Sequence, residues 1–247
     1  MSKKLSGMVA LVTGGSRGIG AAIAKRLAQD GAAVAITYAS SSSKADEVVA
    51  AIEAEGGRAL AVHADSADAD AVKNAVAETA KVLGGLDILV NNAGVAIMKP
   101  FDEFTLDEFD HLVNINVRGV FVGIQEASRH MRDGGRIITI GSVNGDRVPF
   151  PGGSVYALTK AAVAGLTRGL ARDLGPRGIT VNNVQPGPVN TELNPENGPF
   201  AEMLKGIMAL PRYGKDDEVA SLVAFLASPE AAFITGASID IDGGFKA

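Results

Sequence analysis

The sequence predicts a single doubly wound, Rossmann-type α/β domain with a seven-stranded parallel sheet and helices on both faces. Three observations lead to this prediction. Short apolar runs alternate with longer amphipathic stretches, a glycine-rich turn follows the first apolar run, and no linker divides the pattern. Since 247 residues are enough to bury one large core, residues 1–247 are assigned to one domain.

Seven short apolar runs are the expected strands. They are rich in Val, Ile, Leu and Ala and are too short for typical helices. In chain order they cover residues 8–12, 33–37, 59–62, 86–90, 136–140, 179–184 and 238–241. Their alternation with helical segments is typical of βαβ units, which build a parallel sheet.

Six amphipathic stretches are the expected helices. They cover residues 19–28, 44–55, 70–83, 105–131, 154–174 and 216–226. Thr105 and Glu108 have the spacing of a capping box, which predicts that the long fourth helix begins there.

Composition argues against several classes of function. With 23 basic and 28 acidic residues the formal charge is −5 and no block of like charges occurs, so nucleic acid is not an expected partner. Cysteine is absent and the three histidines lack the spacing of metal ligands, so neither disulfides nor a metal site is expected. No apolar run approaches the ~18 residues of a membrane span, and we expect a soluble, cytoplasmic protein.

The glycine-rich turn after the first expected strand is a candidate dinucleotide site. Glycines allow a tight turn there, and the following helix presents backbone N–H groups to a pyrophosphate. The residues assigned to this contact are Gly14, Ser16, Arg17, Gly18, Ile19 and Gly20. Because glycine-rich turns also occur in ordinary loops, the strand-to-helix position of this turn supports the assignment.

The end of the second expected strand indicates which dinucleotide is bound. Chains that bind NAD usually have an acidic residue at this point to hold the ribose 2′-hydroxyl. Here Tyr38, Ser40 and Ser41 occur instead, and no Asp or Glu is present in the segment. Arg17, together with these serines and Lys44, is suited to accept a 2′-phosphate, which favours NADPH over NADH. The alternative left open is that Arg17 points to solvent and both cofactors are accepted.

Tyr156 and Lys160 are four residues apart in an expected helix, so their side chains share one face. An ammonium group beside a phenol favours the phenolate, and moving the phenol pKa from ~10 to ~7 needs about 4 kcal/mol. A unit charge about 4 Å away in a partly screened site supplies about that much. Such a pair in isolation is usually a surface feature, so the other motifs decide its meaning.

Further motifs occur in a fixed order around this pair, each at the end of an expected strand or inside the long helix. They are the glycine turn at 13–20, Asn91-Asn92-Ala93-Gly94, Asn116, Ser142, Tyr156 with Lys160, and Pro186-Gly187. Over nearly the whole chain, these motifs resemble those of the short-chain dehydrogenase/reductases.

The resemblance implies a catalytic tetrad. Tyr156 would exchange a proton with the substrate oxygen while hydride moves to or from the nicotinamide, and Ser142 would hydrogen-bond the same oxygen. Lys160 would lower the pKa of Tyr156 and hold the nicotinamide ribose, and Asn116 would join a water chain that returns the proton. The alternatives are a strand-end cap for Ser142 and a local helix defect for Asn116.

The resemblance also implies further cofactor contacts. Asp65 would contact the adenine, although an Asx-turn explains this residue as well. Asn92, Ala93 and Gly94 would follow the ribose on the adenine side, with a structural turn as the alternative. The stretch that covers the nicotinamide would include Pro186, Gly187, Val189 and Thr191.

The substrate side is less sharply defined. Residues 187–212 are expected to form a lid, with Phe200, Met203, Leu204, Ile207 and Met208 as candidate substrate contacts or core residues. The opposite wall would consist of Val143, Asn144, Val148, Phe150 and Pro151.

The resemblance is greatest to 3-oxoacyl-acyl-carrier-protein reductases and related carbonyl reductases. It implies NADPH-dependent hydride transfer between the nicotinamide and a small carbonyl or secondary alcohol substrate, which would be a ketone, a 3-oxoester or a 3-oxoacyl thioester, with acyl carrier protein as a possible partner. Many such reductases have a dense basic patch before the fifth strand. Here residues 129–133 contain basic side chains but also the acid Asp133. Arg172 and Arg177 are left as other sources of positive charge.

A second class remains open. Segments 141–147, 185–188, 194–195 and 197–199 resemble a subgroup that includes a cyclic-di-GMP-binding protein, which would act by sequestration. The family resemblance also implies a homotetramer built on the fourth and fifth expected helices, with a dimer as the alternative.

Overall fold

The structure, a computed structural model, describes residues 3–247 and contains one parallel sheet. Its strand order is β3-β2-β1-β4-β5-β6-β7, and every neighbouring pair is parallel. The strands are β1 Val9–Val12, β2 Ala33–Tyr38, β3 Arg58–His63, β4 Leu86–Asn91, β5 Met131–Ile140, β6 Thr180–Pro186 and β7 Ser238–Ile241. All seven expected strands are therefore confirmed, and with them the doubly wound fold.

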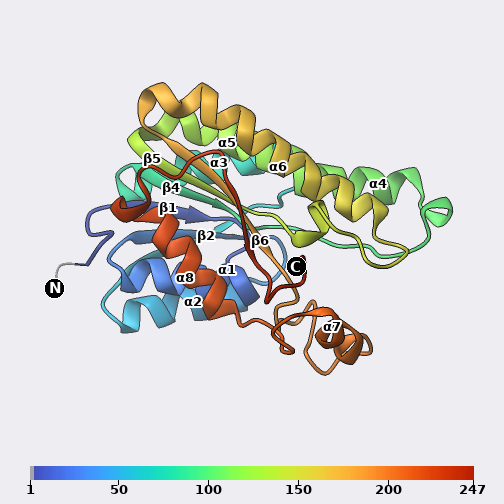
Figure 1. Cartoon of the computed structure of the whole chain (residues 1–247). Coiled ribbons are helices and arrows are strands. Elements are labelled where there is room, and N and C mark those ends of the chain that lie inside the picture. Colours follow the sequence, from blue (N-terminus) through green and yellow to red (C-terminus); the bar gives the residue numbers. More distant parts are fainter. Residues whose placement is uncertain (1–2) are drawn as a thin grey trace.

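Helices cover both faces of the sheet (Figure 1). On one face lie α1 Gly18–Gln29, α2 Ser42–Ala54 and α8 Asp216–Ala227; on the other lie α3 Ala69–Leu83, α4 Leu106–Val113, α5 Val120–His130 and α6 Ser154–Leu174. The short helix α7 Ala201–Ile207 projects beyond the sheet near the C-terminus.

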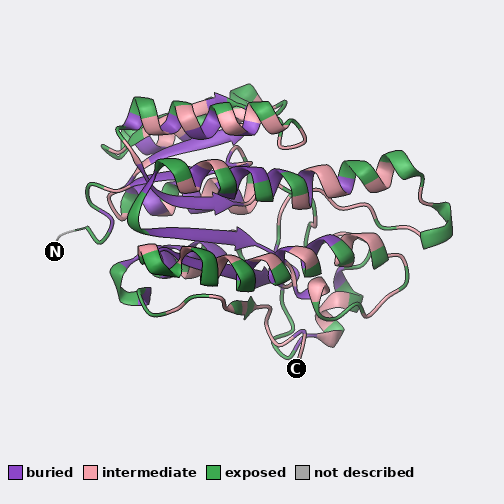
Figure 2. Ribbon diagram, turned by 90° about the horizontal axis from the view of Figure 1, so that it is seen from above, coloured by how far each residue is buried: buried purple, intermediate pink, exposed green. Residues whose placement is uncertain are grey.

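The sheet is buried from both sides, as its continuous apolar strands require. Figure 2 shows the central strands buried between helices whose outer faces are exposed, whereas the edge strands β3 and β7 are partly exposed. One core cluster joins the sheet to α1 and α8, with Ile23 and Val223 fully buried. A second joins it to α3, α5 and α6 through Val76, Ile124 and Val163. This packing fixes the strand ends that carry the candidate site.

The long fourth helix differs from the expectation in two respects. Thr105 and Glu108 form the expected capping box, but residues Asn114–Gly119 adopt a π-helix between α4 and α5. The helix ends at His130 because Met131 already begins β5, where it pairs with Leu86. The apolar Met131 fits the stripe of a helix as well as a buried strand, so the pattern alone placed it in the helix.

The strand order reverses its direction between β1 and β4. The loops after these two strands therefore diverge to opposite faces and leave a crevice at the carboxyl edge, where open α/β sheets bind ligands. The glycine turn and the 92–94 segment form the two sides of this crevice.

Candidate active site

The glycine turn packs directly on the loop after β4. Gly14 has a φ of 63°, and a Cβ placed there would lie 2.9 Å from the Ala93 Cα. A Cβ on Gly20 would lie 2.3 Å from the Gly14 carbonyl oxygen and 2.4 Å from Asn92 Nδ2. Asn92 Nδ2 itself donates to the carbonyl oxygens of Thr13 and Gly14. Residues larger than glycine are thus excluded at these two positions of the turn. The Asn92 side chain holds the turn in place, which is the structural role given above as the alternative to cofactor contact.

The N-terminus of α1 opens at this turn without a side-chain cap. Arg17 is the N-cap residue, with extended φ and ψ, and no side chain bonds the first-turn amides. Ser16 is partly buried beside it, and Ile19 packs against the main core. Uncapped N–H groups behind a close-packed glycine turn have the chemistry that a pyrophosphate requires, so the residues present fit a dinucleotide.

Arg17 and Lys44 are both partly exposed to solvent and pair with the same carboxylate. Arg17 Nη1 lies 3.4 Å from Glu192 Oε2, and Lys44 Nζ lies 2.5 Å from Glu192 Oε1. Ser40 is exposed, and Ser41 is the N-cap residue of α2 without a side-chain cap bond. The two cations proposed for a 2′-phosphate therefore share one carboxylate, that of Glu192, which sequence reasoning did not find.

Tyr38 and Asp65 lie at the ends of β2 and β3. The Tyr38 ring meets the ring of His63 edge-on, with the centroids 5.5 Å apart. Asp65 Oδ1 accepts a hydrogen bond from the Ala67 N–H at 2.9 Å, which is the Asx-turn that the sequence left as an alternative. The Asp65 side chain is otherwise exposed.

Ser142, Tyr156 and Lys160 come together where β5 ends and α6 begins. Burial raises the pKa of the Tyr156 phenol, and a hydrogen bond with the Ser142 side chain opposes that rise. Lys160 Nζ is buried 5.7 Å from the centre of the Tyr156 ring and donates to the Ile140 carbonyl oxygen at 3.0 Å. Burial lowers the pKa of Lys160 to about 8.

That Lys160 lowers the pKa of Tyr156 stays a prediction, because burial of the phenol and the hydrogen bond with Ser142 are the influences on that pKa in the structure. The ammonium group is directed to a strand carbonyl, and burial of the phenol is the larger effect. An i,i+4 spacing brings two side chains to one face but does not set where their ends point.

Asn116 lies inside the π-helix and is 2% exposed. Its Oδ1 accepts from the Val95 N–H at 2.9 Å, while its Nδ2 donates to the Val95 carbonyl at 2.8 Å and to Thr159 Oγ1 at 3.1 Å. A Cβ on Gly94 would lie 3.4 Å from Asn116 Oδ1 and 3.6 Å from Lys160 Nζ. Asn116 thus connects the 93–95 loop to α6, and its side-chain amide is fully used in these structural hydrogen bonds.

The stretch after β6 crosses the mouth of the crevice. Pro186 ends β6, and the Gly187 N–H donates to the Ile241 carbonyl. The Val189 side chain is buried in the main core, so it is not free to contact a cofactor. Thr191 Cγ2 lies 3.5 Å from the position of a Cβ on Gly18, which puts Thr191 directly over the glycine turn.

The rest of residues 187–212 divides into a packed part and an exposed part. Leu204, Ile207 and Met208 pack with Val143 and Phe245 in a small core cluster. By contrast, Phe200 and Met203 are exposed, and so is Val148 on the expected opposite wall. The exposed apolar side chains are the ones left for contact with another molecule.

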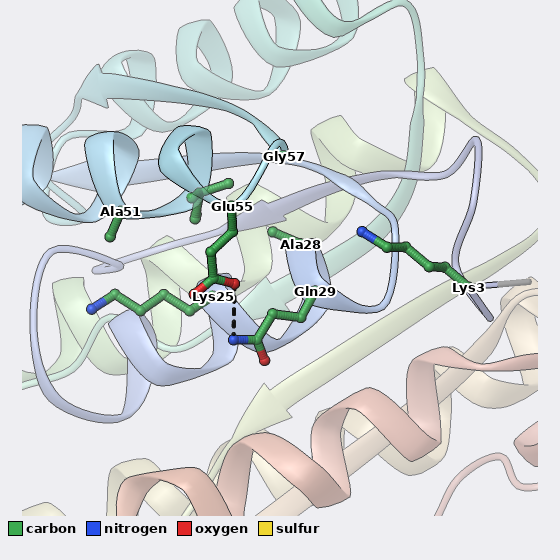
Figure 3. Close-up of a pocket in the computed structure, with 8 residues that line it drawn as sticks. Lys3, Lys25, Ala28, Gln29, Ala51, Glu55 and Gly57 are labelled. Atoms are coloured by element: carbon green, nitrogen blue, oxygen red, sulfur yellow. Dashed lines mark hydrogen bonds between the residues drawn. The ribbon is translucent and has the colours of Figure 1, made fainter. Parts of the chain in front are cut away.

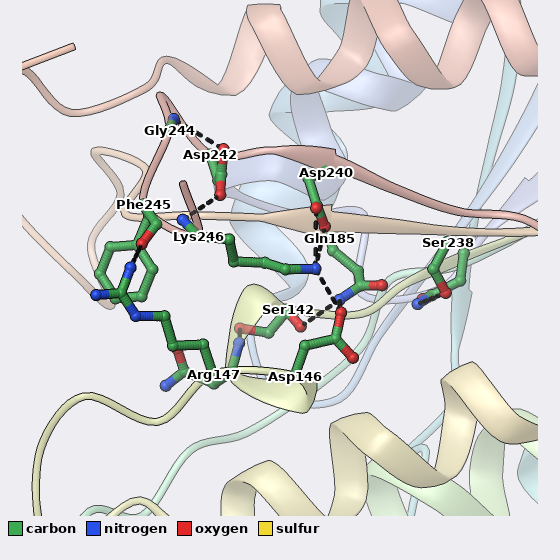
Figure 4. Close-up of polar contacts among 12 residues, drawn as sticks. Ser142, Asp146, Arg147, Gln185, Ser238, Asp240, Asp242, Gly244, Phe245 and Lys246 are labelled. Atoms are coloured by element: carbon green, nitrogen blue, oxygen red, sulfur yellow. Dashed lines mark hydrogen bonds and ion pairs between the residues drawn. The ribbon is translucent and has the colours of Figure 1, made fainter. Parts of the chain in front are cut away.

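A polar network beneath Ser142 was not predicted from the sequence. Gln185 Nε2 donates to the Ser142 carbonyl at 3.2 Å and to Asp146 Oδ2 at 3.0 Å. Lys246 bonds the carboxylates of Asp146 and Asp240, so the C-terminal tail closes the network (Figure 4). Sequence distance hides this arrangement, because Lys246 and Asp146 are 100 residues apart.

The basic residues near the start of β5 are neutralised by acids. Arg129 and His130 contact Glu126, Arg132 contacts Asp87, and Arg177 contacts Asp133. Each basic residue of this segment, and Arg177 with them, thus lies beside an acid, whereas Arg172 is exposed and forms no ion pair within residues 3–247.

A cavity of about 200 Å³ lies away from these residues, between the C-terminal ends of α1 and α2 (Figure 3). Its lining includes Lys3, Lys25 and Gln29, and Gln29 Nε2 donates to Glu55 Oε2 at 3.2 Å. This is the edge of the sheet opposite Tyr156. Across residues 3–247 the structure has no cluster of potential metal ligands and no helix long and apolar enough to cross a membrane.

Comparison with known proteins agrees with the fold. The sequence matches the family described as Enoyl-(Acyl carrier protein) reductase over residues 14–246. The cyclic-di-GMP-binding biofilm dispersal mediator protein of Escherichia coli is 50% identical over 242 residues, which cover 98% of each chain. The 3-oxoacyl-acyl-carrier-protein reductase FabG of Staphylococcus aureus is 43% identical over 238 residues, which cover 95% of this chain and 96% of that one.

Two solved structures are similar over the whole fold. A short-chain dehydrogenase/reductase from Serratia marcescens has a TM-score of 0.98 at 61% identity, with 99% of this chain and 100% of that chain covered. A short chain dehydrogenase from Burkholderia cenocepacia, solved in complex with NADP, has a TM-score of 0.98 at 57% identity with the same coverage. The fold and site thus define a Rossmann-type oxidoreductase. More narrowly, the chain belongs to the short-chain dehydrogenase/reductase family.

Proposed function

We propose that this chain is an NADPH-dependent reductase of small ketones, aldehydes or 3-oxoesters, with Tyr156 as the general acid. The observation that carries the proposal is the grouping of Tyr156 and Ser142 beside a buried Lys160 at the carboxyl edge of the sheet. The cofactor proposal is supported by the uncapped N-terminus of α1, by Arg17 and Lys44, and by the NADP held by the Burkholderia cenocepacia relative.

Each member of the group has a distinct part in the proposed reaction. The nicotinamide nucleotide supplies the hydride when it is bound. Tyr156 gives the substrate oxygen a proton, and Ser142 donates a hydrogen bond to that oxygen as negative charge develops. A Tyr156 pKa raised by burial keeps the phenol protonated at neutral pH, as an acid must be before it acts.

Lys160 and Asn116 act behind Tyr156. With its pKa at about 8, Lys160 holds its proton at neutral pH and still releases it readily, which suits a group that returns a proton to Tyr156. Because the side-chain amide of Asn116 is committed to Val95 and Thr159, we assign the contact with a water chain to its main-chain carbonyl.

We propose that residues 187–212 form the lid over the substrate and the nicotinamide. Within this segment Thr191 lies over the glycine turn, and Phe200 and Met203 present exposed apolar surface to a substrate. A closed lid would exclude water from the hydride. The neutralised basic residues at 129–133 favour small carbonyl compounds over substrates carried on an acidic protein.

We propose that the chain assembles as a homotetramer through α4–α5 and α6. Phe121 on α5 and Leu158 on α6 are 46% and 49% exposed, and Ala161 and Gly165 are also exposed, so the surface allows close packing. Light scattering would test this, with a mass near four times the 25.3 kDa of one chain expected and a dimer mass as the contrary result.

A second candidate function is sequestration of cyclic-di-GMP. It is favoured by the 50% identity to the Escherichia coli protein of that description. The test sets steady-state oxidation of NADPH with a panel of ketones, aldehydes and acetoacetyl thioesters against retention of cyclic-di-GMP by the purified chain. NADPH-dependent turnover supports the reductase, whereas nucleotide retention without turnover supports the second candidate.

A further inference from the structure

Glu192 joins the proposed lid to both cations of the proposed nucleotide site. Its two carboxylate oxygens are each engaged, one by Lys44 at 2.5 Å and the other by Arg17 at 3.4 Å. The hydrogen bond from Lys44 and, to a smaller extent, the charge of Arg17 hold the pKa of Glu192 below its usual range. The group is therefore ionised at neutral pH, and both cations are already partnered.

These cations are the side chains that an anion on the adenosine ribose would meet. They flank the end of β2, where Ser40 and Ser41 supply hydroxyls and no acidic residue occurs. Within residues 3–247, no carboxylate other than Glu192 forms an ion pair with Arg17 or Lys44. Glu192 thus already engages the two cations that are proposed to hold the 2′-phosphate.

The backbone holds Glu192 in this position. The N–H groups of Thr191 and Asn194 donate to each other's carbonyl oxygens at 3.3 Å and 3.1 Å, which closes a tight turn around Glu192. Tyr213 Oη donates to Asn194 Oδ1 at 3.3 Å, which adds a hydrogen bond between this turn and a residue outside it. Since Thr191 packs over Gly18, the turn lies against the glycine loop, and the Glu192 side chain extends across it to α2.

We propose that Glu192 is a specificity-determining residue, an internal carboxylate that competes with the 2′-phosphate of NADPH for Arg17 and Lys44. The inference rests on the proposed use of NADPH. A 2′-phosphate carries more charge and more acceptor oxygens than a carboxylate, so it displaces Glu192 from both cations. NADH has a hydroxyl at this position and binds without displacing Glu192. The carboxylate therefore weakens NADPH binding selectively and releases the first turn of the lid when NADPH binds.

The test compares Glu192→Gln with the matched control Glu196→Gln, an exposed lid carboxylate that pairs with neither cation. Dissociation constants for NADPH and NADH are measured by calorimetry on the full chain without substrate. Glu192→Gln is expected to tighten NADPH binding about two- to tenfold, as expected for the loss of two exposed ion pairs that compete with the ligand. NADH binding should change less than about twofold, and Glu196→Gln should alter neither constant by more than that.

A double-mutant cycle with Arg17→Ala adds a second readout. If Glu192 acts through Arg17, the gain from Glu192→Gln shrinks in the Arg17→Ala background. Weaker NADPH binding by Glu192→Gln overturns the proposal, because it means that Glu192 closes over the bound nucleotide. An equal gain for NADPH and NADH, or no change, overturns it as well.

These outcomes are separate from those that test the reaction. NADPH binding that responds to Glu192→Gln but leads to no carbonyl reduction supports the role of Glu192 and refutes the reductase. If the chain reduces carbonyl compounds but Glu192→Gln leaves the dissociation constant for NADPH unchanged, the reductase is supported and the role of Glu192 is refuted.

Discussion

Replacement of Lys160 by methionine is expected to stabilise the nucleotide-free protein while it removes the proposed proton relay. Lys160 is 7% exposed, and the described residues offer its ammonium group one hydrogen bond, to the Ile140 carbonyl, and no carboxylate partner. A charged group that is buried without an opposite charge lowers the free energy of unfolding. Methionine fills similar space without the charge.

The magnitude follows from the pKa of Lys160. Burial lowers it from 10.5 to about 8, and a difference of about 2.5 pH units corresponds to about 3 kcal/mol against the folded state. Loss of the bond to Ile140 removes about 1 kcal/mol of stabilisation. Lys160→Met should therefore raise the free energy of unfolding at neutral pH by about 2 kcal/mol.

The pH dependence identifies the charge as the cause. Because the pKa of Lys160 is lower in the folded state, the unfolded chain binds more protons between pH 8 and 10.5. The cost of the buried ammonium is complete below pH 8 and disappears as the pH rises through 10.5. The gain in the free energy of unfolding of Lys160→Met over the wild type should accordingly fall across this window. Above it the variant should be slightly less stable than the wild type.

Chemical unfolding at fixed protein concentration, from about pH 7 to about pH 10.5, measures both quantities. Lys81→Met, on the exposed surface of α3, is the matched control and should leave the free energy of unfolding nearly unchanged. The reasoning is refuted if Lys160→Met is no more stable than the wild type at neutral pH, or if its advantage stays constant across the window.

The remaining predictions concern the proposed reaction and its support. Tyr156→Phe should lower kcat by about 100-fold or more while the Kd for NADPH stays within about twofold, because only the proton donor is lost; a variant that keeps most of its kcat contradicts the acid assignment. Arg17→Ala should raise the KM for NADPH about tenfold and that for NADH little, since one charge-assisted contact to the 2′-phosphate is removed; equal effects contradict that contact. Gln185→Leu should lower kcat more than it raises KM, because the Ser142 carbonyl and Asp146 lose the amide donor that they share. Recovery of kcat in Gln185→Asn, whose side chain is shorter, would contradict the requirement that this donor reach both acceptors.

Much of the fold was predictable because its signals are local. Apolar runs of strand length, separated by amphipathic helices, predicted all seven strands, and the capping box at Thr105 set the start of the long helix. The π-helix at Asn114–Gly119 was not predicted; Asn116 within it bonds partners outside the helix, the backbone of Val95 and the hydroxyl of Thr159, which a local pattern does not reveal.

The site was predictable where its residues form motifs and not where its contacts join distant segments. The glycine turn and the Tyr156 helix do lie at one edge of the sheet, as strand order requires. Glu192, however, is 175 residues from Arg17 and 148 from Lys44 in the chain, so no spacing reveals their ion pairs. The direction of the Lys160 ammonium depends on a strand carbonyl, which a helix pattern does not describe.

The central claim is that Tyr156 and its neighbours reduce a carbonyl group with hydride from NADPH. The measurement that tests it most directly is carbonyl-dependent NADPH oxidation by the purified chain and by Tyr156→Phe, over a panel of ketones, aldehydes and acetoacetyl thioesters. The account predicts turnover by the wild-type chain that the variant loses, with NADH a poorer donor. NADPH bound but not oxidised with any substrate, together with tight retention of cyclic-di-GMP, would contradict it.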